Sequence, residues 1–362
     1  MSISAYVGNA VRRFGSRTAL IEGGRRWTFA ELDSLVERLA RGLAACLPPG
    51  GRVGLFMANR AEYILLQMAL ERASLVRVPL NARYTAFEVA NVVKDCGAQA
   101  LFFDSATAKR VDKLSIPGFW YAEVASDNAQ GGPSWAALIR LGERSGPAAP
   151  PDYDDLCSIN YTSGSSGEPK GVMLTHRKWF SVYKNMLIDR DIWGSDRLAH
   201  VGPLTHASGT YVAPFFLRGA TNIVVEGGRV EALLEAIERH KVTAFTLVPT
   251  VLTRIVNHPG IDGRDLSSLR WISYGAEAIQ THTLEKALAL FGPILSQNYG
   301  LTEAMMTCSQ LLPQEHFLAQ GDFSALRLGT IGRPYSFVDI ELRDCEGRPV
   351  PDQSRAEDHH RT

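Results

Sequence analysis

The sequence predicts an α/β protein with two doubly wound, mostly parallel sheet sub-domains packed together, followed by a partial small β-barrel. Strand-like apolar runs alternate with helix-like segments along most of the chain. A stretch rich in Gly, Pro, Ser and Ala interrupts this alternation between residues 125 and 155. The pattern changes again after Gly329, where a half-exposed antiparallel strand is expected. A chain of 362 residues is long enough for two or three sub-domains.

The first half contains two helix starts with a clear sequence signal. Thr28–Glu31 and Thr85–Glu88 both fit the capping box, in which the two side chains satisfy free backbone amides at a helix start. Apolar residues follow each box at helical spacing. The other elements expected in this half are one helix and three short strands, at 60–73, 52–59, 75–80 and 100–103.

A second series of strands and helices is expected between 198 and 310. The strands are predicted at 222–226, 242–248, 269–275 and 293–300, and the helices at 230–241, 250–258 and 281–291. A strand at 337–344 and a turn at 345–348 would begin the β-barrel. The predicted units are a first α/β sub-domain at 1–197, a second at 198–310, the barrel start at 311–352, and a disordered polar tail at 353–362.

The composition excludes several classes of protein. Lys and Arg total 38, as do Asp and Glu, so the net charge gives no support for a nucleic-acid-binding surface. The five cysteines are scattered and form no C-x-x-C pair, which argues against a disulfide framework or a zinc site. No apolar run approaches the roughly 18 residues of a membrane span. A soluble cytoplasmic protein is therefore expected.

The stretch YTSGSSGEPKGV at 161–172 allows four interpretations. It could be a flexible linker, although Pro169 and Lys170 make it stiffer and more charged than a typical Gly/Ser linker. A Walker A loop requires a glycine directly before its lysine, and the G-x-S-x-G nucleophile motif does not fit around Ser165 or Ser166. The remaining interpretation is another kind of phosphate-binding loop, in which glycines, hydroxyls and a lysine surround the anion.

The longer segment YTSGSSGEPKGVMLTH resembles the signature loop of the AMP-forming adenylate superfamily, which includes acyl-CoA synthetases and luciferases. Further segments are similar to motifs of the same family in the same order. GPLTHASG resembles the segment beside the acyl group, SYGAEAI the loop against adenine, QNYGLTEA the Y-G-x-T-E motif, and IGRP the lead-in to the small barrel. The resemblance covers essentially residues 15–350.

The resemblance implies a two-step reaction, in which ATP and a carboxylic acid give an acyl-adenylate and CoA then displaces AMP. It implies that the phosphates of ATP contact the loop residues Thr162, Ser163, Gly164, Ser165, Ser166, Gly167 and Lys170. Adenine would contact Tyr299, Gly300 and the backbone of Gly275, Ala276 and Glu277. The implied catalytic residues are His206 near the substrate carboxylate, Thr302 at the α-phosphate and Glu303 as a ligand of Mg²⁺.

The acid is expected to be fatty or aryl, because PLTHASG is more similar to ligases of those acids than to amino-acid-activating domains. Candidate pocket neighbours are the residues beside the motifs, namely Gly209, Tyr211, Ser273, Tyr274, Gly275 and Met305. The expected partners are ATP, the acid and CoA, with no nucleic acid and no membrane insertion, and with a homodimer as an open alternative.

The family pattern continues with a T-G-D segment, a hinge and a lysine-bearing C-terminal domain, and none of these has a counterpart here. We therefore expect the large N-terminal domain alone, ended by a frameshift, a premature stop or an altered gene, with weak or absent full activity. The alternative is a catalytically silent binder of nucleotide or acyl groups. A serine hydrolase is a distant third interpretation.

Overall fold

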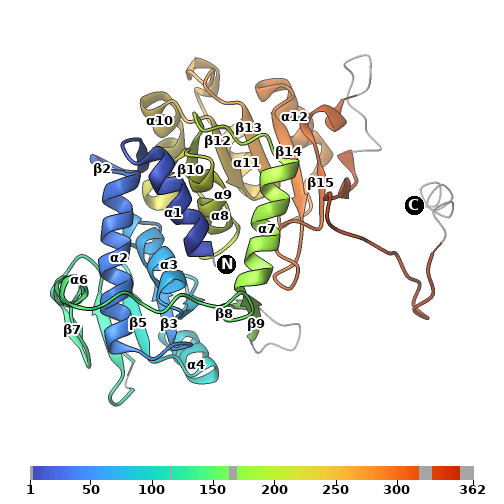
Figure 1. Cartoon of the computed structure of the whole chain (residues 1–362). Helices are drawn as coiled ribbons and strands as arrows, with labels where there is room; N and C mark the ends of the chain where they lie inside the picture. Colours follow the sequence, from blue (N-terminus) through green and yellow to red (C-terminus); the bar gives the residue numbers. More distant parts are fainter. Residues whose placement is uncertain (1–2, 115, 163–168, 318–327, 351–362) are drawn as a thin grey trace.

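The computed structural model describes residues 3–114, 116–162, 169–317 and 328–350. The described residues form two sheets with helices on both faces, as the sequence predicts (Figure 1). One sheet has seven strands in the order β7-β6-β5-β3-β4-β8-β9. The other has nine strands in the order β16-β15-β14-β13-β12-β10-β11-β1-β2.

The seven-stranded sheet is parallel except at its two edges. Its parallel strands are β3 (Arg52–Phe56), β4 (Val76–Pro79), β5 (Ala100–Phe103), β6 (Trp120–Glu123) and β8 (Leu156–Thr162). The antiparallel edge strands are β7 (Ala129–Gln130) and β9 (Lys170–Thr175). The helices of this half are α2 (Phe29–Cys46), α3 (Ala61–Arg72), α4 (Ala86–Cys96), α5 (Ala108–Val111) and α6 (Trp135–Arg144).

The apolar side chains of these strands alternate between two cores. Leu55 and Phe102 join the core that includes α2 and α3, whereas Phe56 and Leu101 pack with α4. This alternation places helices on both faces of the sheet. Both capping boxes are confirmed, since Thr28 and Thr85 exchange hydrogen bonds with the residue three positions later.

The nine-stranded sheet has a parallel centre. It contains β10 (Arg197–His200), β11 (Thr221–Val224), β12 (Ala244–Leu247), β13 (Trp271–Gly275) and β14 (Leu295–Tyr299). The helices α10 (Val230–His240), α11 (Pro249–Val256) and α12 (Thr281–Phe291) cover one face. The other face packs with α1 (Ile3–Phe14), α7 (His176–Asp189), α8 (Ala207–Thr210) and α9 (Val212–Leu217). Short 3₁₀ turns are η1 (Glu226–Gly228), η2 (Ile261–Gly263) and η3 (Pro313–His316).

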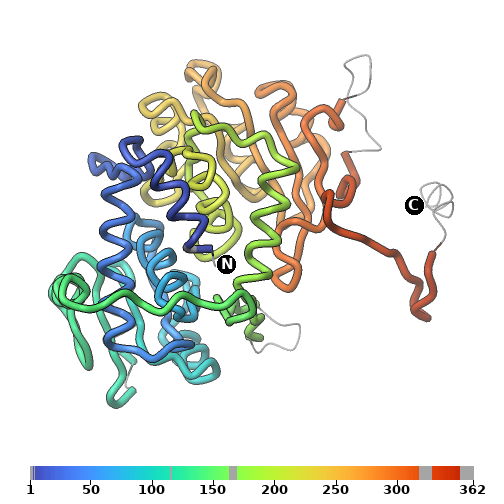
Figure 2. The backbone as a smooth tube through the Cα atoms, in the orientation of Figure 1, coloured from blue at the N-terminus to red at the C-terminus, as the bar shows by residue number. Residues whose placement is uncertain are grey.

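The start of the chain belongs to the sheet of the second half. β1 (Thr18–Glu22) pairs in parallel with β11, and β2 (Arg25–Thr28) pairs with β1. Figure 2 shows α1 beside the segment that contains α9, and Ile3 and Phe216 from these helices belong to one core. The residues at 1–197 therefore contribute to both sheets. The proposed division into continuous units stays a prediction.

The described part of the barrel region forms no closed barrel. β15 (Ser309–Leu311) and β16 (Arg333–Pro334) instead extend the nine-stranded sheet in antiparallel fashion. The strand expected at 337–344 is wrong, because the only pairing there is a bridge from Arg343 to Pro349 around the expected turn. A strand requires a neighbour for its backbone hydrogen bonds, and this segment extends away from the body (Figure 2). The tail at 353–362 lies outside the described residues.

Candidate functional site

Most of the residues expected in the site lie at the carboxyl ends of the parallel strands in the nine-stranded sheet. In an open α/β sheet, ligands bind outside this edge. Gly275 ends β13 and Tyr299 ends β14, and these neighbouring strands pair Gly275 with Asn298. The segment expected to contact adenine, 275–277, therefore begins beside the Y-G-x-T-E motif at 299–303. The structure thus brings the two predicted segments together.

Close backbone contacts fix the geometry of both segments. A Cβ atom on Gly275 would lie 2.2 Å from the carbonyl oxygen of Asn298, and one on Gly300 would lie 2.5 Å from the amide nitrogen of Met306. Only glycine permits such approaches without a shift of the backbone. Ala276 has a φ of 70°, in the left-handed region that is costly for a residue with a side chain. Strain of this kind concentrates at functional sites.

The expected ligand-contacting side chains at this edge are open to solvent. Tyr299 is 39% exposed, and Glu303 and Glu277 are also exposed, whereas Thr302 is half-buried. Glu277 accepts a hydrogen bond from Thr250 Oγ1 at 3.0 Å. The ring of Tyr299 and the carboxylate of Glu303 are therefore available to a bound molecule.

His206 follows β10 at the same edge of the sheet. Its Nδ1 lies 2.7 Å from Thr205 Oγ1, and neighbouring protein atoms lower the pKa of its imidazole by removing part of the surrounding water. The imidazole is therefore neutral at physiological pH.

Asn59 holds the loop between β10 and His206 in place. It follows β3 of the other sheet, and its Nδ2 donates to the carbonyl of Gly202 at 2.7 Å and to that of His200 at 3.3 Å. Its Oδ1 accepts from the backbone amide of Leu204 at 2.8 Å. Asn59 thus links the carboxyl edges of the two sheets. Asn59 could not be predicted from the sequence, because no local pattern distinguishes an asparagine at a strand end that binds a loop more than a hundred residues away.

The expected phosphate loop begins and ends in a β-hairpin. Thr162 pairs with Lys170 where β8 and β9 meet, and Lys170 is exposed. Tyr161, directly before, donates a hydrogen bond to the carboxylate of Asp95, and burial raises the pKa of this tyrosine well above its usual range. The remaining loop residues, Ser163, Gly164, Ser165, Ser166 and Gly167, lie outside the described residues.

Residues 7–357 match the model of a known family, described as AMP-binding enzyme. The chain belongs to this family. It is 33% identical over 343 residues to a feruloyl-CoA synthase of Amycolatopsis sp, covering 94% of this chain and 66% of that protein. It is 29% identical to the medium/long-chain-fatty-acid–CoA ligase FadD8 of Mycobacterium tuberculosis, covering 94% of this chain and 60% of the relative. The chain thus spans about two thirds of the length of these relatives.

The same fold is found in a solved structure. The N-terminal domain of FACL13 from Mycobacterium tuberculosis, with an inhibitor bound, superimposes with a TM-score of 0.83 at 25% identity. The match covers 96% of this chain and 86% of that one. The likeness agrees with the expectation of a large N-terminal domain.

Two of the expected pocket neighbours lie together, and a third faces away. Tyr211 Oη and Ser273 Oγ are 3.1 Å apart, and both side chains are buried. Tyr274 points to the opposite face of β13, where its hydroxyl contacts His316 Nε2 at 3.0 Å. Successive side chains of a strand alternate between faces, so Tyr274 is a core residue of the α10–α12 side. The expectation that it lines the pocket with Ser273 is wrong.

The described residues contain no group of three or more His, Cys, Asp or Glu that could hold a metal ion. A Mg²⁺ ion that accompanies a nucleotide needs only one or two carboxylates beside the phosphates, and an exposed Glu303 fits that requirement. Among the helices of the described segments, none is long and apolar enough to cross a membrane.

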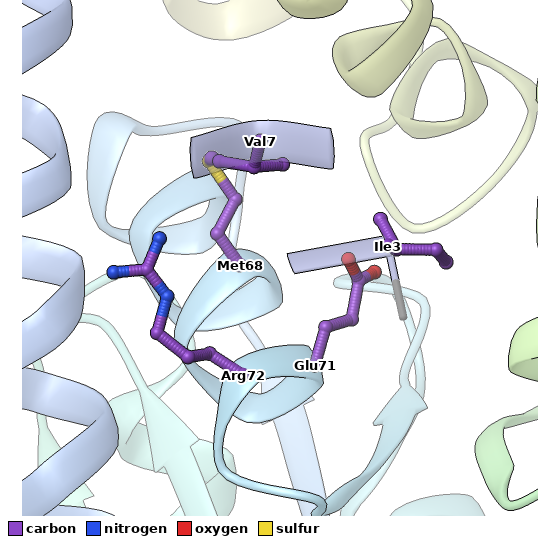
Figure 3. A pocket seen from close by; sticks show the side chains of 5 residues that line it. All are labelled: Ile3, Val7, Met68, Glu71 and Arg72. Atoms are coloured by element: carbon purple, nitrogen blue, oxygen red, sulfur yellow. The ribbon is translucent and has the colours of Figure 1, made fainter. Parts of the chain in front are cut away.

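A small cavity under α1 lies apart from this edge. Figure 3 shows it, lined by Ile3, Val7, Met68, Glu71 and Arg72. Its volume of about 10 Å³ can hold about one water molecule, so the cavity is too small for a nucleotide or an acid.

Proposed function

We propose that this protein is an acid–thiol ligase of the acyl-CoA synthetase type. A carboxylate oxygen of the acid attacks the α-phosphorus of ATP, the bond to the β-phosphate oxygen breaks, and pyrophosphate leaves. The thiol of CoA then attacks the acyl carbon, loses its proton, and releases AMP. The observation that carries the proposal is the meeting of 275–277 with 299–303 at one sheet edge, within a chain of this family.

The nucleotide would bind along this edge. Tyr299 would stack on adenine, and the backbone of Gly275, Ala276 and Glu277 would lie on the other side. Thr302 would donate a hydrogen bond to the α-phosphate, and Glu303 would hold Mg²⁺, which neutralises phosphate charge when bound. The support is that Tyr299 and Glu303 are exposed and that backbone contacts fix Gly275 and Gly300.

The hairpin loop would bind the β- and γ-phosphates. Lys170 would supply positive charge and Thr162 a hydroxyl donor, and residues 163–167 between them would supply backbone amides. Pairing of Thr162 with Lys170 supports this role, because it holds the two ends of the loop together where β8 ends and β9 begins. Positioning and charge neutralisation are the main contributions that a protein makes to phosphoryl transfer.

The acid would bind beside His206, whose neutral imidazole can donate a hydrogen bond to a carboxylate without trapping it in an ion pair. The acid would be fatty or aryl, since relatives named for both kinds of acid match the chain. We also propose a cytoplasmic location, with a homodimer as an alternative to a monomer. All five cysteines are free, in line with a reducing compartment.

The test combines a binding and a turnover measurement. Calorimetry with ATP and with an acyl-sulfamoyladenosine, a stable mimic of the acyl-adenylate, measures the site, and ATP–pyrophosphate exchange measures adenylation. Tyr299→Ala and Thr302→Ala should weaken binding, whereas Leu342→Ala, at an exposed residue outside the two segments, is the control. Binding without exchange would favour the alternative of a catalytically silent nucleotide or acyl binder. No binding of either ligand would refute the proposal.

A further inference from the structure

A buried polar layer crosses the space between the nine-stranded sheet and the helices α7 to α9. Its centre is Asn298, whose Nδ2 donates to Tyr211 Oη at 3.1 Å and to Ser273 Oγ. Its Oδ1 accepts from the hydroxyl of Tyr335 at 2.7 Å and from the guanidinium of Arg190. All five side chains are buried. We call these five residues the polar layer.

The polar layer lies directly below the candidate acid site. Gly275 and Ser273 share one face of β13, and Asn298 is the register partner of Gly275 on β14. Two residues along a strand span about 6.6 Å, so Ser273 lies that far below the sheet edge at which Gly275 ends. Tyr211 covers Ser273 from the helix side. An acyl group that enters between His206 and Gly275 therefore meets the layer as it goes deeper.

A cavity of about 290 Å³ lies on the far side of the layer. Trp271 and Ala244, at the amino ends of β13 and β12, line it together with Phe215 and Ser296. The charged residues Asp189, Asp191, Asp196 and Arg270 line it as well. Arg190 belongs to both the layer and the cavity wall. The acid site and this cavity are thus at opposite edges of the same sheet, and the layer residues Ser273 and Asn298 lie between them on β13 and β14.

The layer would be costly for an apolar chain to cross. Arg190 is only 7% exposed, and it forms no ion pair with a carboxylate of the described residues. Its charge is met instead by neutral acceptors and by the rings of Trp271 and Tyr211, at 4.9 and 5.7 Å from its centre. A methylene chain placed there would leave buried donors and acceptors without partners, which is unfavourable.

We propose that the polar layer is the floor of the acyl pocket, and that it limits the enzyme to aromatic or short-chain acids by blocking the way to the cavity beyond. The inference rests on the proposed function, because it requires the acid to bind at the edge where Gly275 and His206 lie. It adds the substrate class and the residues that determine it.

The experiment compares two acyl-sulfamoyladenosines by calorimetry on the full chain. One carries a cinnamoyl group, and the other a dodecanoyl group used below its micelle concentration. The wild type should bind the dodecanoyl compound about thirtyfold more weakly. Asn298→Ala removes the centre of the layer, and it should reduce this ratio to about threefold by letting the chain reach the cavity.

Two further variants keep the result interpretable. Ser273→Ala removes one hydroxyl from the layer and should lower the ratio in the same direction, even where Asn298→Ala does not fold. Asn185→Ala is the matched control, since Asn185 is an equally buried amide on α7 that bonds Thr307 at 3.1 Å outside the layer. It should leave the ratio unchanged.

The possible outcomes separate the two hypotheses. The role of the polar layer as a floor would be refuted if the wild type binds both compounds equally, or if the affinity ratio stays constant in both layer variants. Either result would leave the proposed function in place. A change in Asn185→Ala as large as that in the layer variants would also overturn it. If the chain binds neither compound, both the proposed function and the proposed role of the polar layer are refuted.

Discussion

Replacing Asn59 with alanine should loosen the loop that positions His206 and lower the stability of the fold. The change removes two short hydrogen bonds, to Gly202 at 2.7 Å and from Leu204 at 2.8 Å, and a longer one to His200 at 3.3 Å. A typical intramolecular hydrogen bond contributes a net 0.5–1.5 kcal/mol, so the two short bonds together are worth about 1–3 kcal/mol. The buried amide of Leu204 would also lose its acceptor.

The free energy of unfolding in urea measures this loss, and calorimetry with an acyl-sulfamoyladenosine measures its effect on the site. Asn128→Ala is the matched control, because Asn128 is exposed and bonds only to its own turn and to Glu123. We expect Asn59→Ala to lower both stability and affinity, and Asn128→Ala to change neither. If the two variants lose stability equally, the role assigned to Asn59 as a link between the sheets is wrong.

Three other changes test separate parts of the structure. Gly275→Ala should weaken nucleotide binding and cost about 1–3 kcal/mol of stability, because the new Cβ would meet the carbonyl of Asn298 at 2.2 Å; equal calorimetric affinity in the variant would contradict this. Asp196→Ala should lower the free energy of unfolding by about 3 kcal/mol, because Thr243 Oγ1 and the amide of Trp193 would each lose a hydrogen bond to this buried carboxylate. Asp265→Ala, in an exposed pair with Lys241, should change little in the same urea titration. Burial raises the pKa of Glu71 to about 7, so the folded state holds its proton more tightly than the unfolded state, in which the pKa of a glutamate is near 4.5. Stability should therefore fall as pH rises from about 4.5 to 7. Glu71→Gln should remove this part of the pH dependence of the thermal midpoint. If the midpoint of the variant changes with pH as it does in the wild type, Glu71 is not the cause of the dependence.

The local elements could be predicted from the sequence because each depends on residues close together in the chain. Thr28 and Thr85 cap helices through side chains three positions away, and the apolar spacing of the strands gives their burial directly. The order of the motifs around His206, Gly275 and Tyr299 likewise indicated a nucleotide site before any contact was known. In this sense the fold class, most of the elements and the family resemblance were available from the sequence.

Only the tertiary structure decided how distant segments combine. The pairing of β1 with β11, the bonds of Asn59 to the β10 loop and the contact of Arg190 with Tyr335 join residues more than a hundred positions apart. The strand predicted at 337–344 failed for the same reason, since alternation shows that a segment can be a strand but not which neighbour it will pair with. Local sequence determines backbone preference and burial, whereas long-range hydrogen bonds and packing exist only once the whole chain has folded.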